Sequence, residues 1–137
     1  ETNFFGPWLL ARAFAPVLAR NNGGAIVNVL SALAWTTFPG VATYSATKSA
    51  AWSLSNGLRN ELAGQGTQVV SVHVGYMDTD MAAHVDGPKT SPEDVARQTF
   101  EAVQAGRAEV LADEVSRQLK QGLSSPHPPY AATVAAA

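Results

Sequence analysis

The chain has 137 residues, enough for one domain with a hydrophobic core, and its 46% hydrophobic and 15% charged residues are ordinary for a globular protein. A net charge of −2 without a basic block argues against a nucleic-acid partner. The absence of cysteine excludes disulfides and thiolate metal sites, the three histidines lack the spacing of zinc ligands, and no apolar run reaches the ~20 residues of a membrane helix.

Helical and strand patterns alternate from the start of the chain. Apolar residues recur at helical spacing across residues 3–20, which predicts a first long helix, and the polar and glycine residues 21–24 end it. The nearly continuous apolar run 25–30, between a glycine pair and a serine, is typical of a buried parallel strand.

The middle of the chain repeats this order. Residues 31–43 form a predicted loop containing Pro39-Gly40, and residues 44–62 form a predicted second long helix that ends at Gly64-Gln65-Gly66. The valine-rich segment 68–74 predicts a second buried strand, which ends at Gly75.

The last third holds two shorter helices and one strand. Ser91-Pro92 supplies an N-cap and a first-turn proline for a third helix, which ends at Gly106. Residues 109–112 predict a short strand and residues 113–123 a last helix. The tail, residues 124–137, is rich in proline and alanine and is predicted to be disordered.

This order of elements predicts an α/β fold, a parallel sheet with helices on both faces. Three strands make a thin sheet, and one of them would be an exposed edge unless an upstream segment covered it. The chain also begins without methionine, as if an upstream segment were missing, so we expect half of a larger sheet. No signal peptide is visible, which says little about the location of the parent protein, and a cytoplasmic location is the default expectation.

The run Tyr44-Ser45-Ala46-Thr47-Lys48 can carry chemistry. Residues four apart share one face of a helix, so the phenol and the ammonium point the same way. A free tyrosine exchanges protons near pH 10, and a nearby cation favours the phenolate, which makes this pair a candidate general acid/base. A solvated surface pair would have the same spacing.

Ser31 directly follows the first predicted strand, at the sheet edge where open α/β sheets bind ligands. Its hydroxyl could hydrogen-bond a substrate carbonyl beside Tyr44, thirteen positions later. A serine that caps a turn is equally common at such a place.

Three motifs together resemble the short-chain dehydrogenase/reductase superfamily in its single-domain form: Asn3-Phe4-Phe5-Gly6, Ile26-Val27-Asn28-Val29-Leu30-Ser31 and Tyr44-Ser45-Ala46-Thr47-Lys48. The resemblance implies the C-terminal catalytic part of a Rossmann-like, doubly wound NAD(P)-binding domain over residues 1–123. It also implies an oxidoreductase that interconverts a small-molecule carbonyl and an alcohol with NAD or NADP, without a metal.

The resemblance assigns a role to each catalytic candidate. Tyr44 matches the acid/base, and Lys48 matches the residue that favours the phenolate and binds the nicotinamide ribose. Ser31 matches the hydroxyl that orients the substrate oxygen. Asn3 matches the residue that holds a water in the proton relay, although its position also suits a helix cap.

A fourth motif, Val74-Gly75-Tyr76-Met77-Asp78-Thr79, departs from the family pattern because Val74 replaces a proline. The resemblance implies that Gly75, Met77 and Thr79 bind the cofactor, and that the Met77 backbone and the Thr79 side chain contact the nicotinamide carboxamide. Loss of the proline is expected to loosen this loop slightly. Residues 81–88 match the family's substrate loop, whereas the acidic residues before them also suit a solvated loop.

Three aromatic residues permit further expectations. Trp35 and Phe38 lie between Ser31 and Tyr44 and could form an apolar wall of the substrate pocket, while Trp52 suits an interface or the core. In the family, the helices that match residues 3–20 and 44–62 pack against a second subunit, which implies a homodimer or homotetramer.

The family's glycine-rich phosphate turn has no counterpart in the chain, and Gly23-Gly24 does not replace it because it precedes a strand. We therefore expect a fragment with catalytic groups but without most of the cofactor site. Two alternatives remain: a truncated, non-enzymatic product that only dimerises, and a member with epimerase or dehydratase chemistry, which the spacing fits poorly. The substrate does not follow from the sequence.

Overall fold

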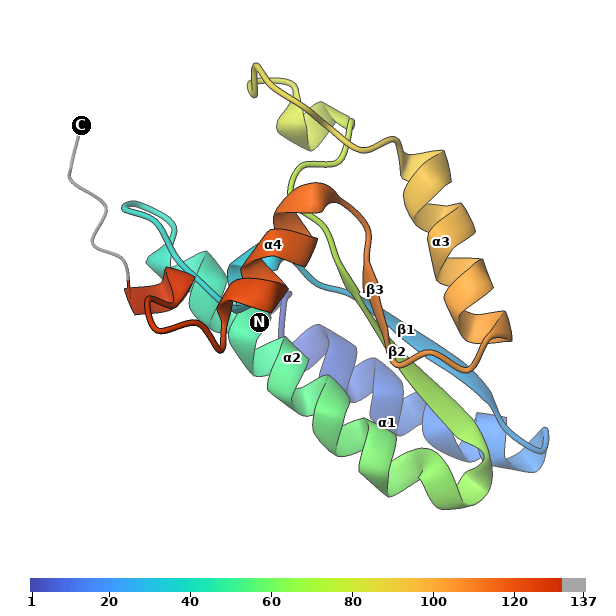
Figure 1. The fold of residues 1–137 in the computed structure, drawn as a ribbon. Helices are drawn as coiled ribbons and strands as arrows, with labels where there is room; N and C mark the ends of the chain where they lie inside the picture. Colours follow the sequence, from blue (N-terminus) through green and yellow to red (C-terminus); the bar gives the residue numbers. More distant parts are fainter. Residues whose placement is uncertain (132–137) are drawn as a thin grey trace.

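The structure is a computed structural model that describes residues 1–131 of the chain. Helices and strands alternate along it in the predicted order (Figure 1). They are α1 (Phe5–Arg20), β1 (Gly24–Val29), α2 (Ala42–Leu62), β2 (Thr67–His73), α3 (Pro92–Gln104), β3 (Glu109–Leu111) and α4 (Glu114–Gly122).

The three strands form one parallel sheet in the order β1-β2-β3. Gly24 is paired with Thr67 at the start of the first ladder, and His73 with Leu111 at the end of the second. Helices α1 and α2 lie on one face of the sheet and α3 on the other (Figure 1). The predicted α/β architecture is confirmed.

The core is built around β2, the central strand. Val69 packs with residues of α1 and α2, whereas Val70 and Val72 pack with residues of α3 and β3, and none of the three valines is exposed. A strand covered on both faces needs apolar residues at successive positions, because each face must be filled. This explains why valines stand at successive positions 69 and 70 and again at 72, so that both faces of the strand are filled.

The turns before β1 and β2 touch through glycine backbone. Gly23 has a φ of 106°, and a Cβ on it would lie 2.3 Å from the Gly66 carbonyl oxygen. The Gly24 amide donates to the same oxygen at 3.3 Å. This close approach aligns the first residues of the two strands and leaves no room for a side chain at position 23.

Element boundaries differ from the predicted ones by one or two residues at most ends. Helix α2 begins at Ala42, so Tyr44 lies in its first turn and not at its start. The predicted loop after β1 also contains a 3₁₀ turn, Ala32–Ala34, with Ser31 as its N-cap.

The C-terminal segment differs from the prediction of a disordered tail. The chain forms a 3₁₀ turn at Pro129–Ala131, and the Thr36 hydroxyl donates to the Pro129 carbonyl at 3.4 Å. Residues 132–137, the rest of the predicted tail, lie outside the described residues.

Strand β1 is an edge of the sheet within the described residues, and it is apolar. Val29 is 54% exposed, and the adjacent α1 exposes further large apolar side chains: Phe5, Leu9, Leu10 and Phe14. Exposed apolar surface of this kind is typical of interaction sites.

No helix among residues 1–131 is long and apolar enough to cross a membrane.

Candidate active site

The first turns of α2 bring Tyr44 and Lys48 together, as the four-residue spacing predicts. The Lys48 Nζ lies 5.6 Å from the centre of the Tyr44 ring. The Tyr44 side chain is 41% exposed, so its hydroxyl end can meet a ligand, whereas Lys48 is partly buried. An exposed phenol beside a cation is the arrangement that an acid/base pair requires.

Lys48 also ties α2 to the C-terminal end of β1. Its Nζ donates a hydrogen bond to the Val29 carbonyl at 3.0 Å, and burial lowers the pKa of Lys48 below its ordinary value. A lower pKa makes the ammonium a better proton donor. The contact places the Tyr44–Lys48 pair at the sheet edge where ligands of open α/β sheets bind.

Asn3 lies beside this pair. Its Nδ2 donates to the Thr47 hydroxyl at 3.1 Å, and that hydroxyl donates to the Tyr44 carbonyl at 2.7 Å. The structure does not support Asn3 as a helix cap, because Phe4 occupies the N-cap position of α1 and no side chain caps it. Asn3 therefore joins the start of the chain to the α2 turn that carries Tyr44 and Lys48.

A hollow of about 360 Å³ runs between α1 and the exposed edge of β1. Asn3 and Lys48 contribute polar groups to it, and most of the remaining lining is apolar, with Leu10, Phe14 and Val29 among the side chains. The polar residues of the site thus border an uncovered apolar surface.

Ser31 follows β1 and is almost completely buried. Its Oγ accepts a hydrogen bond from the Leu33 amide at 3.1 Å, so the capping role that the sequence left open is present in the structure. The capping contact uses Oγ as an acceptor and leaves the hydroxyl proton available for a substrate oxygen. Capping and a catalytic role are compatible.

The loop after β2 carries the three expected cofactor contacts, Gly75, Met77 and Thr79. The Gly75 amide donates to Asp113 Oδ2 at 2.6 Å, while Asp113 Oδ1 caps α4 by accepting from the Ser116 amide at 2.8 Å. One carboxylate therefore fixes both the start of the loop and the start of α4.

Further along the loop, Met77 forms a parallel bridge with Thr90. The Asp78 amide donates to the Thr90 carbonyl at 2.9 Å, and the Thr90 amide donates to the Tyr76 carbonyl at 2.8 Å. The Thr79 hydroxyl bonds the Met77 carbonyl at 3.4 Å. These contacts restrain a loop that has Val74 where the family that the sequence resembles has a proline. They also join Thr90 to residues 76–78, a connection that the sequence did not predict.

The aromatic residues after Ser31 separate in the structure. Trp35 is buried, stacks on the His73 ring at 3.9 Å and meets Trp52 edge-on at 6.1 Å. Trp35 therefore belongs to an internal cluster. The Trp35 side chain also lines a second, shallow hollow together with Tyr130. Phe38 is exposed, and Trp52 fits the core alternative because it faces into this cluster.

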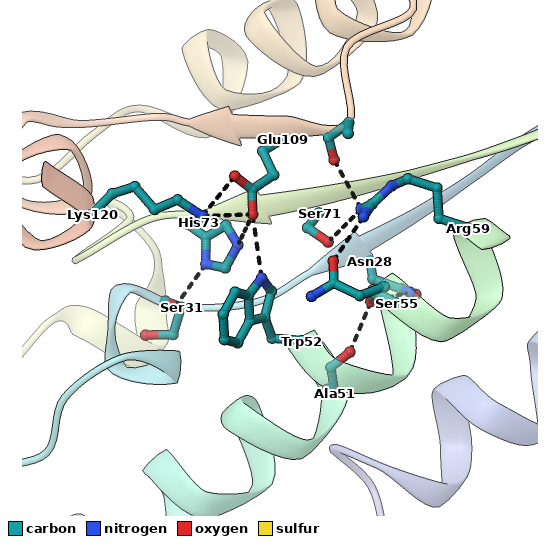
Figure 2. A network of polar contacts seen from close by, with 12 residues as sticks. Asn28, Ser31, Ala51, Trp52, Ser55, Arg59, Ser71, His73, Glu109 and Lys120 are labelled. Carbon is teal, nitrogen blue, oxygen red and sulfur yellow. Dashed lines mark hydrogen bonds and ion pairs between the residues drawn. The ribbon is translucent and has the colours of Figure 1, made fainter. Parts of the chain in front are cut away.

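A polar network beneath Ser31 was not anticipated from the sequence (Figure 2). Its residues come from α2, β2, β3 and α4, and they are Trp52, His73, Glu109 and Lys120. Burial raises the pKa of Glu109, but the Lys120 ammonium and the Trp52 indole N–H outweigh it, so the net pKa lies below its ordinary value. Glu109 is therefore ionised within the network.

Comparison with known proteins identifies the family to which the chain belongs. A family model described as short chain dehydrogenase matches residues 1–89, which include Asn3, Ser31, Tyr44 and Lys48. The chain belongs to the short-chain dehydrogenase family. Its members are oxidoreductases, and the parallel sheet covered by helices on both faces agrees with solved structures of the family.

Relatives in this family match most of the chain. A short-chain dehydrogenase from Burkholderia cenocepacia, solved in complex with NADP, is 38% identical with a TM-score of 0.87 over 93% of this chain and 53% of its own. An uncharacterized oxidoreductase of Staphylococcus aureus is 30% identical over 75% of this chain and 46% of its own length. Dehydrogenase/reductase SDR family member 7B of Xenopus tropicalis is 30% identical over 81% of this chain and 40% of its own. The chain thus spans about half the length of these relatives, or less.

Proposed function

We propose that the chain is the catalytic part of an NAD(P)-dependent oxidoreductase that interconverts a carbonyl and an alcohol. The observation that carries the proposal is the exposed Tyr44 phenol with the Lys48 ammonium 5.6 Å from its ring, beside the C-terminal end of β1. Membership in the short-chain dehydrogenase family supports it.

In the proposed reaction, Tyr44 donates its phenol proton to the carbonyl oxygen of the substrate, and the reverse reaction returns it. The Ser31 hydroxyl donates a hydrogen bond to the same oxygen and orients it. The Lys48 ammonium stabilises the phenolate that proton transfer leaves on Tyr44. Asn3, which is hydrogen-bonded to Thr47, holds a water through which Tyr44 regains its proton.

The residues present fit the nicotinamide end of a dinucleotide. Lys48 supplies a donor for the ribose hydroxyls, and the loop through Gly75, Met77 and Thr79 supplies backbone and hydroxyl groups for the carboxamide. When bound, the nicotinamide would supply or accept the hydride. NADP in the Burkholderia relative supports this class of cofactor, and both NAD and NADP remain candidates.

The rest of the cofactor site is proposed to come from sequence that this chain does not contain. No glycine-rich phosphate turn follows a strand in residues 1–131, and the match covers 46% and 40% of the lengths of the Staphylococcus and Xenopus relatives. The unpaired edge of β1 and the apolar side chains of α1 support a continuation of the sheet at this edge, because burial there would cover them.

The alternative is a non-enzymatic product that associates through α1 and α2. The exposed apolar side chains of α1 favour some association, and the small residues Ala46, Ser49, Ala50 and Ser53 would permit α2 to approach a second copy closely. The homodimer or homotetramer implied by the family remains a proposal under both functions.

Lys48→Ala in a polypeptide that includes the upstream half tests the proposed function. Loss of the ammonium makes the phenolate less favourable, so the pH above which carbonyl reduction falls should rise by about one unit or more. The KM for NADPH or NADH should rise as well, because a ribose contact is lost. The measurement is the pH profile of dinucleotide consumption, with Arg20→Ala as a control that removes an exposed cation elsewhere. An unchanged pH profile would contradict the role of Lys48.

A further inference from the structure

His73 lies directly behind the proposed catalytic serine. It is the last residue of β2, its side chain has no exposed surface, and its Nδ1 lies 3.2 Å from the Ser31 carbonyl oxygen (Figure 2). The amides on either side of Ser31 are already bonded to β2 and to the residue that follows it, because Leu30 donates to the Val72 carbonyl at 2.8 Å and Ala32 to the Val74 carbonyl at 3.0 Å. The imidazole completes this attachment at the serine itself.

The contact defines the state of the imidazole ring. A carbonyl oxygen only accepts hydrogen bonds, so Nδ1 must carry the proton. Burial lowers the pKa of His73 to about 4, which keeps the ring neutral at physiological pH and leaves Nε2 as an acceptor. Nε2 has no hydrogen-bond partner among the described residues and lies 3.8 Å from Glu109 Oε1.

Packing holds the imidazole ring in place, and an ion pair lies beside it. Trp35 stacks on one face of the imidazole at 3.9 Å with an angle of 22° between the rings. Glu109 and Lys120 are the charged groups that face it: Lys120 Nζ lies 2.8 Å from Glu109 Oε2 and 5.0 Å from the centre of the Trp35 ring. Trp52 Nε1 donates to Glu109 at 3.2 Å, which joins α2 to the same cluster.

We propose that His73 is a positioning residue for Ser31: its Nδ1–H holds the Ser31 carbonyl and thereby fixes the direction of the Ser31 hydroxyl toward the substrate oxygen. The inference rests on the proposed function. The capping contact with the Leu33 amide holds Oγ against the following turn. That contact does not fix the backbone of Ser31 itself, so a rotation of this backbone would move Oγ away from the substrate oxygen. Trp35, Glu109 and Lys120 act through His73 and not on the substrate.

Three variants of the full-length polypeptide separate positioning from packing. His73→Asn keeps an N–H donor at the place of Nδ1, His73→Gln moves the donor farther out, and His73→Leu removes it. We expect His73→Leu to lower kcat by about 10- to 100-fold, the loss that removal of an outer-shell hydrogen-bond partner causes at metal sites. His73→Asn should restore most of that loss and His73→Gln less, with the KM for the dinucleotide nearly unchanged in all three.

Thermal unfolding of each variant shows whether the comparison is made on folded protein. If His73→Leu does not fold, the contrast between the Asn and Gln variants carries the test. Equal kcat in these two variants, or a loss confined to KM, would overturn the inference.

A measurement of the His73 tautomer, which does not depend on catalysis, distinguishes this inference from the proposed function. The ¹⁵N spectrum of the His73 ring in the wild-type polypeptide should show the Nδ1–H tautomer at neutral pH, with an imidazole proton protected from solvent exchange. An Nε2–H tautomer in an active enzyme would overturn the His73 inference alone. A wild type that binds dinucleotide but reduces no carbonyl would overturn the proposed function, and the positioning role would fall with it.

Discussion

Tyr44→Phe is expected to lower kcat for carbonyl reduction by about 10²- to 10⁴-fold, the range that a positioned general acid contributes. The substitution removes only the phenol oxygen, and the Tyr44 side chain is 41% exposed, so the fold should tolerate it. The ring that the Lys48 ammonium approaches is also retained. Dinucleotide affinity should change much less than kcat, because the variant keeps Lys48 and the loop after β2.

Tyr130→Phe is a matched control for this experiment. Tyr130 is also an exposed tyrosine, but it lies in the C-terminal 3₁₀ turn and outside the proposed machinery. The control should keep wild-type kcat. Steady-state rates of the three polypeptides, each with its upstream half, provide the measurement, and Tyr44→Phe activity within tenfold of wild type would refute the acid/base assignment.

Gly23→Ala is expected to destabilise the fold strongly, although it adds only one methyl group. The new Cβ would lie 2.3 Å from the Gly66 carbonyl oxygen and 2.9 Å from its carbonyl carbon, and both atoms belong to backbone that cannot rotate away. The φ of 106° adds strain for any residue with a side chain. We expect the free energy of unfolding to fall by about 2–3 kcal/mol or more.

Gly57→Ala is the control for Gly23→Ala. Gly57 lies inside α2, and a Cβ there would meet no atom within 4 Å. Alanine in a helix interior should stabilise the protein by about 0.5–1 kcal/mol. Urea unfolding of both variants should therefore show shifts of opposite sign, and a Gly23→Ala variant as stable as wild type would contradict the close contact between the two turns.

Much of the fold could be predicted because its signals are local. The valine-rich sequence of β2 reflects burial on both faces. The four-residue spacing of Tyr44 and Lys48 fixes their common helix face before any tertiary contact is known. Ser91 with Pro92 marked the start of α3 correctly, because capping is decided by adjacent residues.

Contacts between distant residues could not be predicted in the same way. The Ser31–His73 contact joins residues 42 positions apart, and the Gly75–Asp113 contact joins residues 38 positions apart. Both depend on the register of neighbouring strands and on where the following segments return to the sheet, which no local pattern encodes. Asp113 was predicted as the first residue of the last helix, whereas the structure shows it as the N-cap of that helix and as the acceptor of the Gly75 amide.

Trp35 shows the same limit. Its place between Ser31 and Tyr44 suggested a pocket wall, yet the 3₁₀ turn Ala32–Ala34 directs the ring onto His73. The helix start at Ala42 was missed because Val41 at the N-cap position supplies no side-chain cap. In both cases tertiary packing determined the local structure.

The central claim is that this chain contributes catalytic groups to a cofactor site completed by sequence outside it. Calorimetric titration with NADPH and NADH tests it directly, using residues 1–137 alone and the same chain with the upstream sequence of its natural source. The claim predicts saturable binding of at least one dinucleotide to the longer polypeptide and none to residues 1–137 at the same concentrations. Equal binding by both polypeptides, or a folded longer polypeptide that binds neither dinucleotide, would contradict it.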